Sequence, residues 1–295
     1  MLRLLPNLFT KKLSVFISAD SIIVMSHASA FSNNNTNKTS KIFTLQNNQS
    51  ANQSVNQAVW QHAFNQLDGL LGDFALAQQI RPNTPLQIVL GSDLVRYLAL
   101  PAQAISMNLA EKNAYASAAF KEIHGNSTDD WQVVCDDAAP QQAMIAAAVD
   151  KKLLQHLSQL ALTHQLKLKS VKPYLMLAMN GLAKKLAKAT AYLAIVEHSR
   201  LTLVMLLQGQ YQQLHSHAIG SDWQAELKHI LMRESVLADV AYRNVFVLAP
   251  AYQNTALIAI NGWHITRIDQ EIRTNSKRHQ GMNFDSRYAM LEAVI

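Results

Sequence analysis

The stretch FISADSIIVM, Phe16 to Met25, is two apolar runs joined by a polar turn, and VEHSRLTLVM, Val196 to Met205, has the same pattern. Short apolar runs on either side of a polar turn are typical of β-hairpins. Each hairpin is followed by a further strand-like run, a long helical segment and another apolar run. The sequence therefore predicts two related α/β halves, which repeat an order of elements rather than an order of residues.

The first predicted half, residues 1–189, combines short apolar runs with amphipathic segments. Two polar, asparagine-rich stretches, residues 32–40 and 47–54, are interpreted as loops. The run AMIAAAVD is apolar on both faces, as expected for a central strand covered from both sides. Beyond the hairpin we expect strands at residues 41–46, 86–91, 94–101, 131–136, 143–150 and 166–173, and helices at 55–79, 110–124 and 151–164, with a basic helical segment before residue 189.

The second predicted half, residues 190–295, starts with three strands separated by turns at Glu197–Ser199 and Gln208–Gly209. We expect the two halves to face each other across a cleft, although a single mixed sheet with helices on both faces also fits this pattern. The remaining predicted elements are a helix at residues 222–240, strands at 244–250, 255–262 and 263–268, and a short helix at 285–294.

The composition limits the classes of partner. With 49% hydrophobic and 16% charged residues in 295 positions, the chain can bury a sizeable core. The formal charge of +6 comes from scattered Lys and Arg, and the densest groups, at 184–188 and 277–279, lack the aromatic interleaving of nucleic-acid-binding surfaces. We therefore expect no nucleic-acid partner; a solvated face is preferred, and weak attraction to an anionic membrane stays open. The single cysteine, Cys135, excludes an intramolecular disulfide and a multi-thiolate metal site.

The sequence shows no segment typical of a membrane span. The apolar stretch from Leu13 to Met25 is interrupted by serines and by Asp20, and it is shorter than the ~20 apolar residues that a bilayer requires. The opening MLRLLPNLFTKK is positively charged, but Pro6 and Asn7 interrupt its apolar run, which argues against a secretion signal. We expect a soluble, cytosolic protein, and an amphipathic N-terminal membrane tether stays open.

The two hairpin turns are the candidate functional site. Duplicated folds of this shape often hold a nucleotide between the halves, with the phosphates at the backbone N–H groups of the turns. The candidate nucleotide-binding residues are Ser18, Asp20 and Ser21 in the first turn and Glu197 and Ser199 in the second. Close approach of backbone to phosphate usually requires glycine, and neither turn contains one. Binding of ATP with Mg²⁺ is therefore disfavoured.

No other motif predicts catalysis or a metal site. The phosphate-binding, nucleophile-elbow and zinc-protease signatures do not occur in the sequence. His215 and His217 alternate on a predicted strand and would share a face, but a zinc or copper site needs three or four convergent ligands. A solvated strand face is the preferred interpretation of this histidine pair.

Three longer strings carry a resemblance to a known family. They are LGSDLVRYLALP at residues 90–101, AAAVDKKLLQHLSQLALTHQLKLKSVKP at 146–173 and AYLAIVEHSRLTLVMLLQGQY at 191–211. In this order they resemble the family of PilM, the cytosolic actin-like protein of type IV pilus assembly, and the cytoplasmic region of its relative, type II secretion protein L. The resemblance spans roughly residues 13–295 and implies an actin-like (ribonuclease H-like) duplicated fold, with two β-sheet and helix halves around a cleft.

The resemblance also carries an expectation about function. Family members that bind nucleotides have Asp-x-Gly-type turns at both phosphate positions, and this sequence has neither. It therefore implies a non-catalytic cytoplasmic scaffold that docks the cytoplasmic tail of an inner-membrane pilus or secretion assembly protein, is peripheral to the membrane through its partners, and couples to a motor ATPase. The alternative is an ATP-binding actin-like ATPase of the same machinery. A homo-oligomer stays open, and no motif identifies the groove for the partner.

Overall fold

The protein is described here by a computed structural model that covers residues 12–27, 39–44, 59–76, 80–136, 138–237, 243–269 and 290–291. These ranges leave out residues 32–38 of the predicted loop at 32–40, the predicted loop at 47–54 and most of the predicted helix at 285–294. No helix in this part of the chain is long and apolar enough to cross a membrane.

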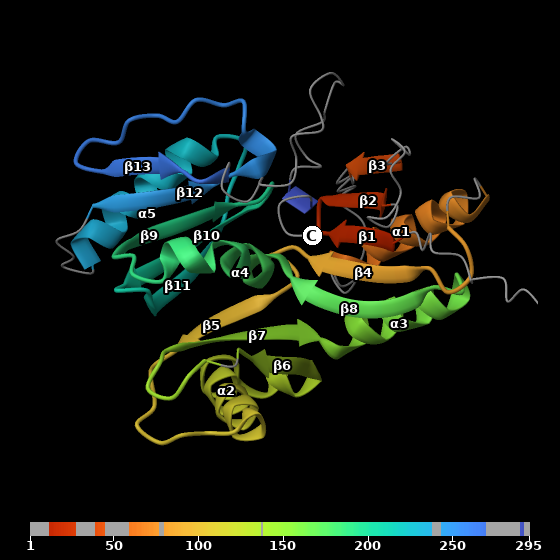
Figure 1. The fold of residues 1–295 in the computed structure, drawn as a ribbon, viewed down its shortest axis with the longest axis horizontal. Coiled ribbons are helices and arrows are strands. Elements are labelled where there is room, and N and C mark those ends of the chain that lie inside the picture. Colours follow the sequence, from red (N-terminus) through yellow and green to blue (C-terminus); the bar gives the residue numbers. More distant parts are fainter. Residues whose placement is uncertain are drawn as a thin grey trace, which may run out of the picture.

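Two five-stranded sheets repeat one topology (Figure 1). The first has the order β3(Thr39–Thr44), β2(Ser21–His27), β1(Lys12–Ile17), β4(Pro85–Leu90), β8(Lys167–Pro173). The second has the order β11(Gln210–Ala218), β10(Arg200–Leu207), β9(Ala191–Val196), β12(Asn244–Leu248), β13(His264–Arg267). In each sheet the three strands that come first in the chain pair with one another antiparallel. The two later strands are parallel: the fourth pairs with the first, and the fifth pairs with the fourth at the edge of the sheet. This confirms the duplicated α/β fold and excludes a single mixed sheet; the boundary at residue 189 stays a prediction.

A third, three-stranded sheet is inserted into the first half. Its order is β5(Arg96–Leu100), β7(Met144–Asp150), β6(Trp131–Cys135), with antiparallel pairing throughout. β7 is the central strand, as its two apolar faces predict, and all of its residues except Asp150 are buried. The helix α2(Leu109–His124) covers one face through Phe120 and is followed by the 3₁₀ turn η1(Gly125–Asp130). The strands were expected, but their separation into a sheet of their own was not.

The remaining helices pack on the two five-stranded sheets and form three hydrophobic clusters with them. α1(Val59–Leu76) and α3(Lys151–Thr163) cover one face of the first five-stranded sheet, where Leu71 and Leu157 are fully buried. α5(Trp223–Leu237) covers the second sheet with Trp223 and Leu231. α4(Tyr174–Leu186) lies between the two sheets, and its core joins residues of both halves (Figure 1). This shared core includes Phe16 and Val89 from the first sheet and Leu193, Ile195 and Leu248 from the second.

The prediction of a strand at residues 255–262 is wrong. After the short 3₁₀ turn η2(Pro250–Tyr252), the segment from 256 to 260 has no regular structure. The side chain of Gln224 on α5 replaces a strand partner, because its Oε1 accepts from the Ile258 amide at 2.7 Å and its Nε2 donates to the Ala256 carbonyl at 3.0 Å. At the other hairpin, Thr39 and Ser40 belong to β3 rather than to the loop expected at 32–40.

Candidate functional site

The two hairpin turns have the tight geometry that the sequence predicts. The β1–β2 turn is closed by the Ser18 amide, which donates to the Ser21 carbonyl at 2.9 Å, and the β9–β10 turn by the Glu197 amide, which donates to the Arg200 carbonyl at 2.8 Å. Inside the first turn the Ser18 hydroxyl donates to Asp20 Oδ1 at 2.6 Å and accepts from the Ser21 amide at 3.0 Å. Ser18, Asp20 and Ser21 therefore bond mainly to one another.

The loop between β4 and β5, residues 91–95, lies against the first turn. β4 is the parallel neighbour of β1, so both strands end at the same edge, and the Gly91 amide donates to the Ile17 carbonyl at 2.7 Å. From this loop the Asp93 carboxylate accepts a hydrogen bond from the Ala19 amide in the turn. A backbone N–H of the first predicted phosphate turn is thus occupied by a side chain of the protein itself.

A second carboxylate crosses between the halves. The Ser92 amide donates to Glu197 Oε2 at 2.9 Å, and Glu197 is only 3% exposed. Gly91 makes this approach possible, since a Cβ built there would lie 2.7 Å from Asp93 Oδ1 and 3.3 Å from Glu197 Oε2. We call the contacts among residues 18–20, 91–95 and 197–199 the joint. Of the predicted residues, Ser199 contributes only its carbonyl, which accepts from the Ile219 amide at 3.0 Å.

The joint has an unusual electrostatic environment. Burial raises the pKa of Glu197 to about 8; Ser92 opposes this rise, and the charges of Asp93 and Asp20 add to it. Burial also raises the pKa of Asp93, and the hydrogen bond from Ala19 opposes that rise. The buried Tyr174 hydroxyl has its pKa raised well above the usual value, first by burial and then by Glu197. A pKa near 8 means that Glu197 is mostly protonated and neutral at pH 7.

This geometry does not fit a nucleoside triphosphate with Mg²⁺. The amides of Ala19 and Ser92, which a phosphate would need, already donate to carboxylates. A phosphate at the turns would also meet the acidic side chains of Asp20 and Asp93, whose negative charge would repel it. Among the residues that the structure describes, no group of His, Cys, Asp and Glu is arranged to hold a metal ion.

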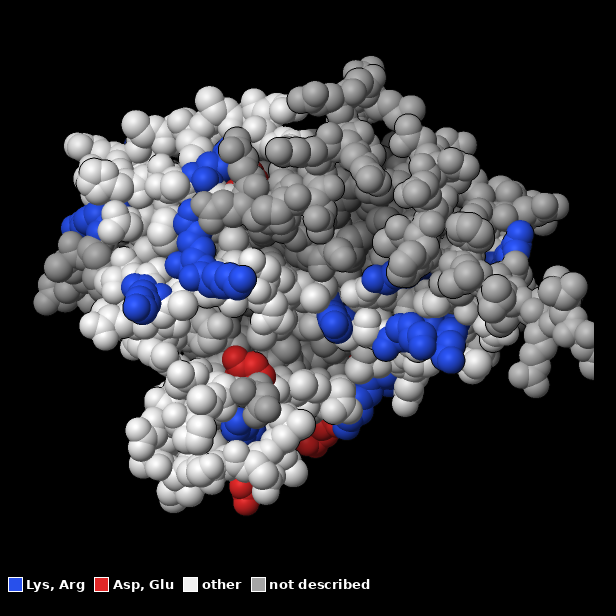
Figure 2. All heavy atoms as spheres, viewed as in Figure 1, with Lys and Arg blue, Asp and Glu red and all other residues white. Residues whose placement is uncertain are grey.

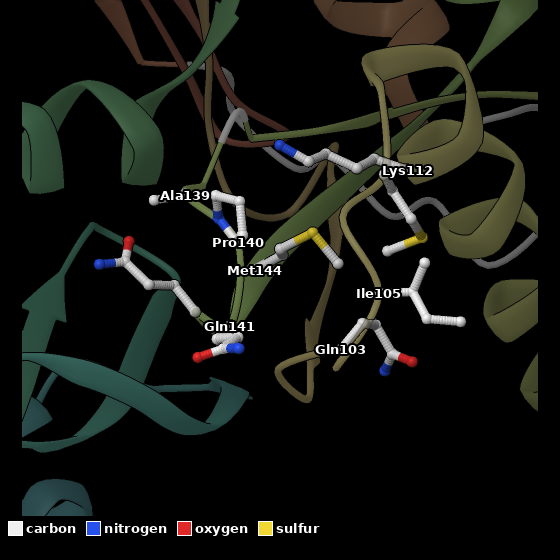
Figure 3. Close-up of a pocket in the computed structure, with 9 residues that line it drawn as sticks. Gln103, Ile105, Lys112, Ala139, Pro140, Gln141 and Met144 are labelled. Atoms are coloured by element: carbon white, nitrogen blue, oxygen red, sulfur yellow. The ribbon is translucent and has the colours of Figure 1, made fainter.

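An open pocket of about 240 Å³ lies elsewhere, at one end of the three-stranded sheet. Figure 3 shows Gln103 and Ile105 on one side, Ala139, Pro140 and Gln141 on the other, and Met144 between them. The buried Lys112 lines it and donates through Nζ to the Ala138 carbonyl at 2.6 Å. The volume of the pocket includes space open to solvent; the part that can hold water-sized groups is only about 20 Å³, far below the roughly 300–1,000 Å³ that is usual for small-molecule sites, and the lining residues include no acid–base pair.

The molecular surface agrees with the scattered charge of the sequence. Figure 2 shows Lys and Arg in separate groups over several elements of one face, with few Asp or Glu. Exposed lysines include Lys167, Lys169 and Lys172 on β8, which is an edge strand. Lysine on an edge strand discourages pairing with strands of other molecules, so this row has a structural explanation.

The sequence located both turns but missed the residues that fill them. Gly91, Ser92 and Asp93 were interpreted only as a turn between two strands, and Tyr174 only as part of a helix. One signal was available: Gly-Ser-Asp follows an apolar strand, and polar residues at the carboxyl end of a parallel strand commonly line a site. The contact with Glu197 could not be found in this way, because 105 positions separate it from Ser92.

Comparisons with known proteins give the fold a name. The sequence matches no protein-family model and no curated protein. A chain of the PilM–PilN type IV pilus biogenesis complex is 11% identical, with 96% of this chain and 97% of that chain covered and a TM-score of 0.61.

Two further solved structures cover 96% of this chain. A Bacteroides thetaiotaomicron protein of unknown function with an actin-like ATPase fold is 10% identical, with 95% of its chain covered and a TM-score of 0.57. The cytoplasmic domain of EpsL, an inner-membrane component of the type II secretion system of Vibrio cholerae, is 11% identical, with 94% of its chain covered and a TM-score of 0.51. At such low identity these likenesses concern architecture alone. The chain has the duplicated, two-lobed actin-like fold.

Proposed function

We propose that the protein is a non-catalytic actin-like scaffold of a type IV pilus or type II secretion assembly platform. In this role it docks the cytoplasmic tail of an inner-membrane partner and stays in the cytoplasm, at the periphery of the membrane. Support comes from the three resembling sequence strings and from the likeness of the fold to a chain of the PilM–PilN complex and to the EpsL cytoplasmic domain.

The observation that carries the non-catalytic part of the proposal is the internal occupation of the turns. Asp93 accepts from the Ala19 amide, and Glu197 accepts from the Ser92 amide at 2.9 Å. Phosphoryl-transfer sites use such amides, together with a metal ion, to neutralise the charge of the phosphates. Here the donors are paired with buried acids, which favours a structural role for the joint.

The experiment has two arms on the same purified protein. In the first, fluorescence anisotropy measures binding of labelled peptides that correspond to the cytoplasmic tails of pilus or secretion inner-membrane proteins encoded beside its gene. We expect saturable binding of one tail and none of its scrambled version. No binding of any tail, or equal binding of the scrambled peptides, would overturn the scaffold role.

The second arm tests nucleotide by titration calorimetry with ATP and Mg²⁺ and by phosphate release. We expect no heat of binding and no turnover, with or without the motor ATPase of the same system. Saturable binding with phosphate release would replace the scaffold by an ATPase. The two arms are independent, so tail binding with turnover would retain the partner and reject only the non-catalytic part.

A further inference from the structure

The joint connects two halves that are also held together elsewhere. The core around α4 contains Phe16 and Val89 from one half and Leu193 and Ile195 from the other, all fully buried or nearly so. At the joint itself, the hydrogen bond between Ser92 and Glu197 links the β4–β5 loop to the β9–β10 turn. The α4 core can therefore keep the halves together while the loop and the turn separate locally.

The surroundings of the Glu197 carboxyl are acidic. Its Oε2 accepts from Ser92, whereas its Oε1 is buried and makes no hydrogen bond within the described residues. The charged groups that act on it are Asp20 from the β1–β2 turn and Asp93 from the β4–β5 loop. Its charge in turn affects two buried tyrosines, Tyr97 from β5 and Tyr174 from α4. Three more titratable or charged groups lie near these neighbours: Arg200 from β10, which acts on Asp93, Asp269, which acts on Tyr174, and His198, which is adjacent in the sequence.

Ionisation of Glu197 is strongly unfavourable in this closed arrangement. Asp93 is bonded to the Ala19 amide and cannot turn away without breaking that contact. Arg200 acts on Asp93, and no ion pair to Glu197 occurs among the described residues. An unpaired carboxylate in a buried site is strongly unfavourable, so the closed state requires a proton. That proton belongs on Oε1, because Oε2 already accepts from Ser92.

We propose that a proton on Glu197 acts as a latch, which holds the β4–β5 loop against the β9–β10 turn and releases both segments when it is lost. The latch uses residues of both halves and needs no nucleotide. It does not depend on the proposed scaffold function. On release, the Ser92 amide and the Glu197 carboxylate become accessible to water, and the core around α4 stays closed.

The latch can be tested by hydrogen exchange of the full chain between pH 6 and pH 9.5, corrected for the intrinsic dependence of exchange on pH. We expect protection of peptides that contain Ser92 or Glu197 to fall by up to about tenfold per pH unit as the pH approaches the midpoint and to level off above it, because one proton is linked to opening. A peptide from β7 serves as the internal reference and should keep its protection. Loss of protection in β7 over the same range would indicate global unfolding and overturn the local latch.

Two variants separate this latch from a general effect of pH. Glu197→Gln keeps an acceptor for the Ser92 amide and cannot ionise, so its protection should not change with pH. Asp20→Asn removes, from a partly exposed position, one of the negative charges that raise the pKa of Glu197. Without this charge Glu197 ionises more easily, so the midpoint of release should move to lower pH. If both variants lost protection at the same pH as the wild type, the proposal would be overturned.

Discussion

Gly91→Ala adds one methyl group at the point where three segments of the joint meet. A Cβ at this position would lie 2.7 Å from Asp93 Oδ1, 2.9 Å from Ser18 Cβ and 3.3 Å from Glu197 Oε2. Gly91 is not among the glycines with positive φ, so its backbone suits alanine and the cost arises from space alone. The change therefore tests whether the joint is as closely packed as the structure indicates.

The expected cost follows from what must move. Asp93 is bonded to the Ala19 amide, and Ser18 is held by hydrogen bonds within its turn. Overpacking of a fixed site costs about 1–3 kcal/mol, and a weakened hydrogen bond to a charged group adds up to about 1.5–3 kcal/mol. The gain from a less flexible unfolded chain offsets about 0.4–1 kcal/mol. We expect a net loss of about 2–3 kcal/mol from these effects.

The assay is equilibrium unfolding in urea at pH 6.5, with Gly181→Ala as the matched control. Gly181 lies on α4, and a Cβ there meets nothing within 4 Å, so its replacement should stabilise the helix by about 0.5–1 kcal/mol. The two changes add the same methyl group, and their effects should have opposite signs. A Gly91→Ala protein as stable as the wild type, with an unchanged slope in urea, would refute the close packing of the joint.

Three further changes test other parts of the structure. A carboxyl group whose pKa rises from 4.5 to about 8 on folding stabilises the protein fully below pH 4.5, and this stabilisation is lost as the pH rises through 8. The wild type should therefore lose up to about 4 kcal/mol relative to Glu197→Gln between pH 5 and pH 9; parallel stability curves in urea would contradict this. Tyr174→Phe removes a buried hydroxyl that has no hydrogen-bond partner among the described residues, and it should raise the free energy of unfolding by about 0.5–1 kcal/mol, whereas a loss of stability would show that the hydroxyl is bonded. Asn108→Ala removes the Oδ1 that accepts from the Glu111 amide in the capping box, but keeps the backbone amide that donates to Glu111, and should cost about 1 kcal/mol in thermal or urea unfolding, while the neighbouring exposed Ser106→Ala should have little effect.

The sequence was sufficient for elements whose own residues determine them. The apolar run of β7 identified a central strand, and the polar turns at Ser18–Ser21 and Glu197–Arg200 identified both hairpins. The segment at 255–262 has equally apolar residues, and it was wrongly predicted as a strand. Its backbone groups bond to Gln224, which lies 34 positions from Ile258, so its local pattern could not distinguish the two outcomes.

The candidate site was predictable only in part for the same reason. The turns are local, but the partners of their amides come from elsewhere in the chain: Asp93 is 74 positions from Ala19, and Glu197 is 105 positions from Ser92. The parallel pairing of β1 with β4 places the β4–β5 loop beside the first turn. That pairing follows from tertiary packing, so a turn without glycine could be recognised as unsuited to phosphate but not as already filled.

In the second half, an amide at the carboxyl end of the parallel strand β12 is also bonded to a carboxylate. Ala249 directly follows β12, the counterpart of β4, and its amide donates to Asp269 Oδ1 at 2.6 Å. Asp269 is buried and also pairs with Arg267 at 2.8 Å. The carboxyl ends of parallel strands are where α/β folds usually leave donors for a ligand. In both halves these donors bond to carboxylates of the chain, so the amides that a ligand would use hold the protein's own segments together instead.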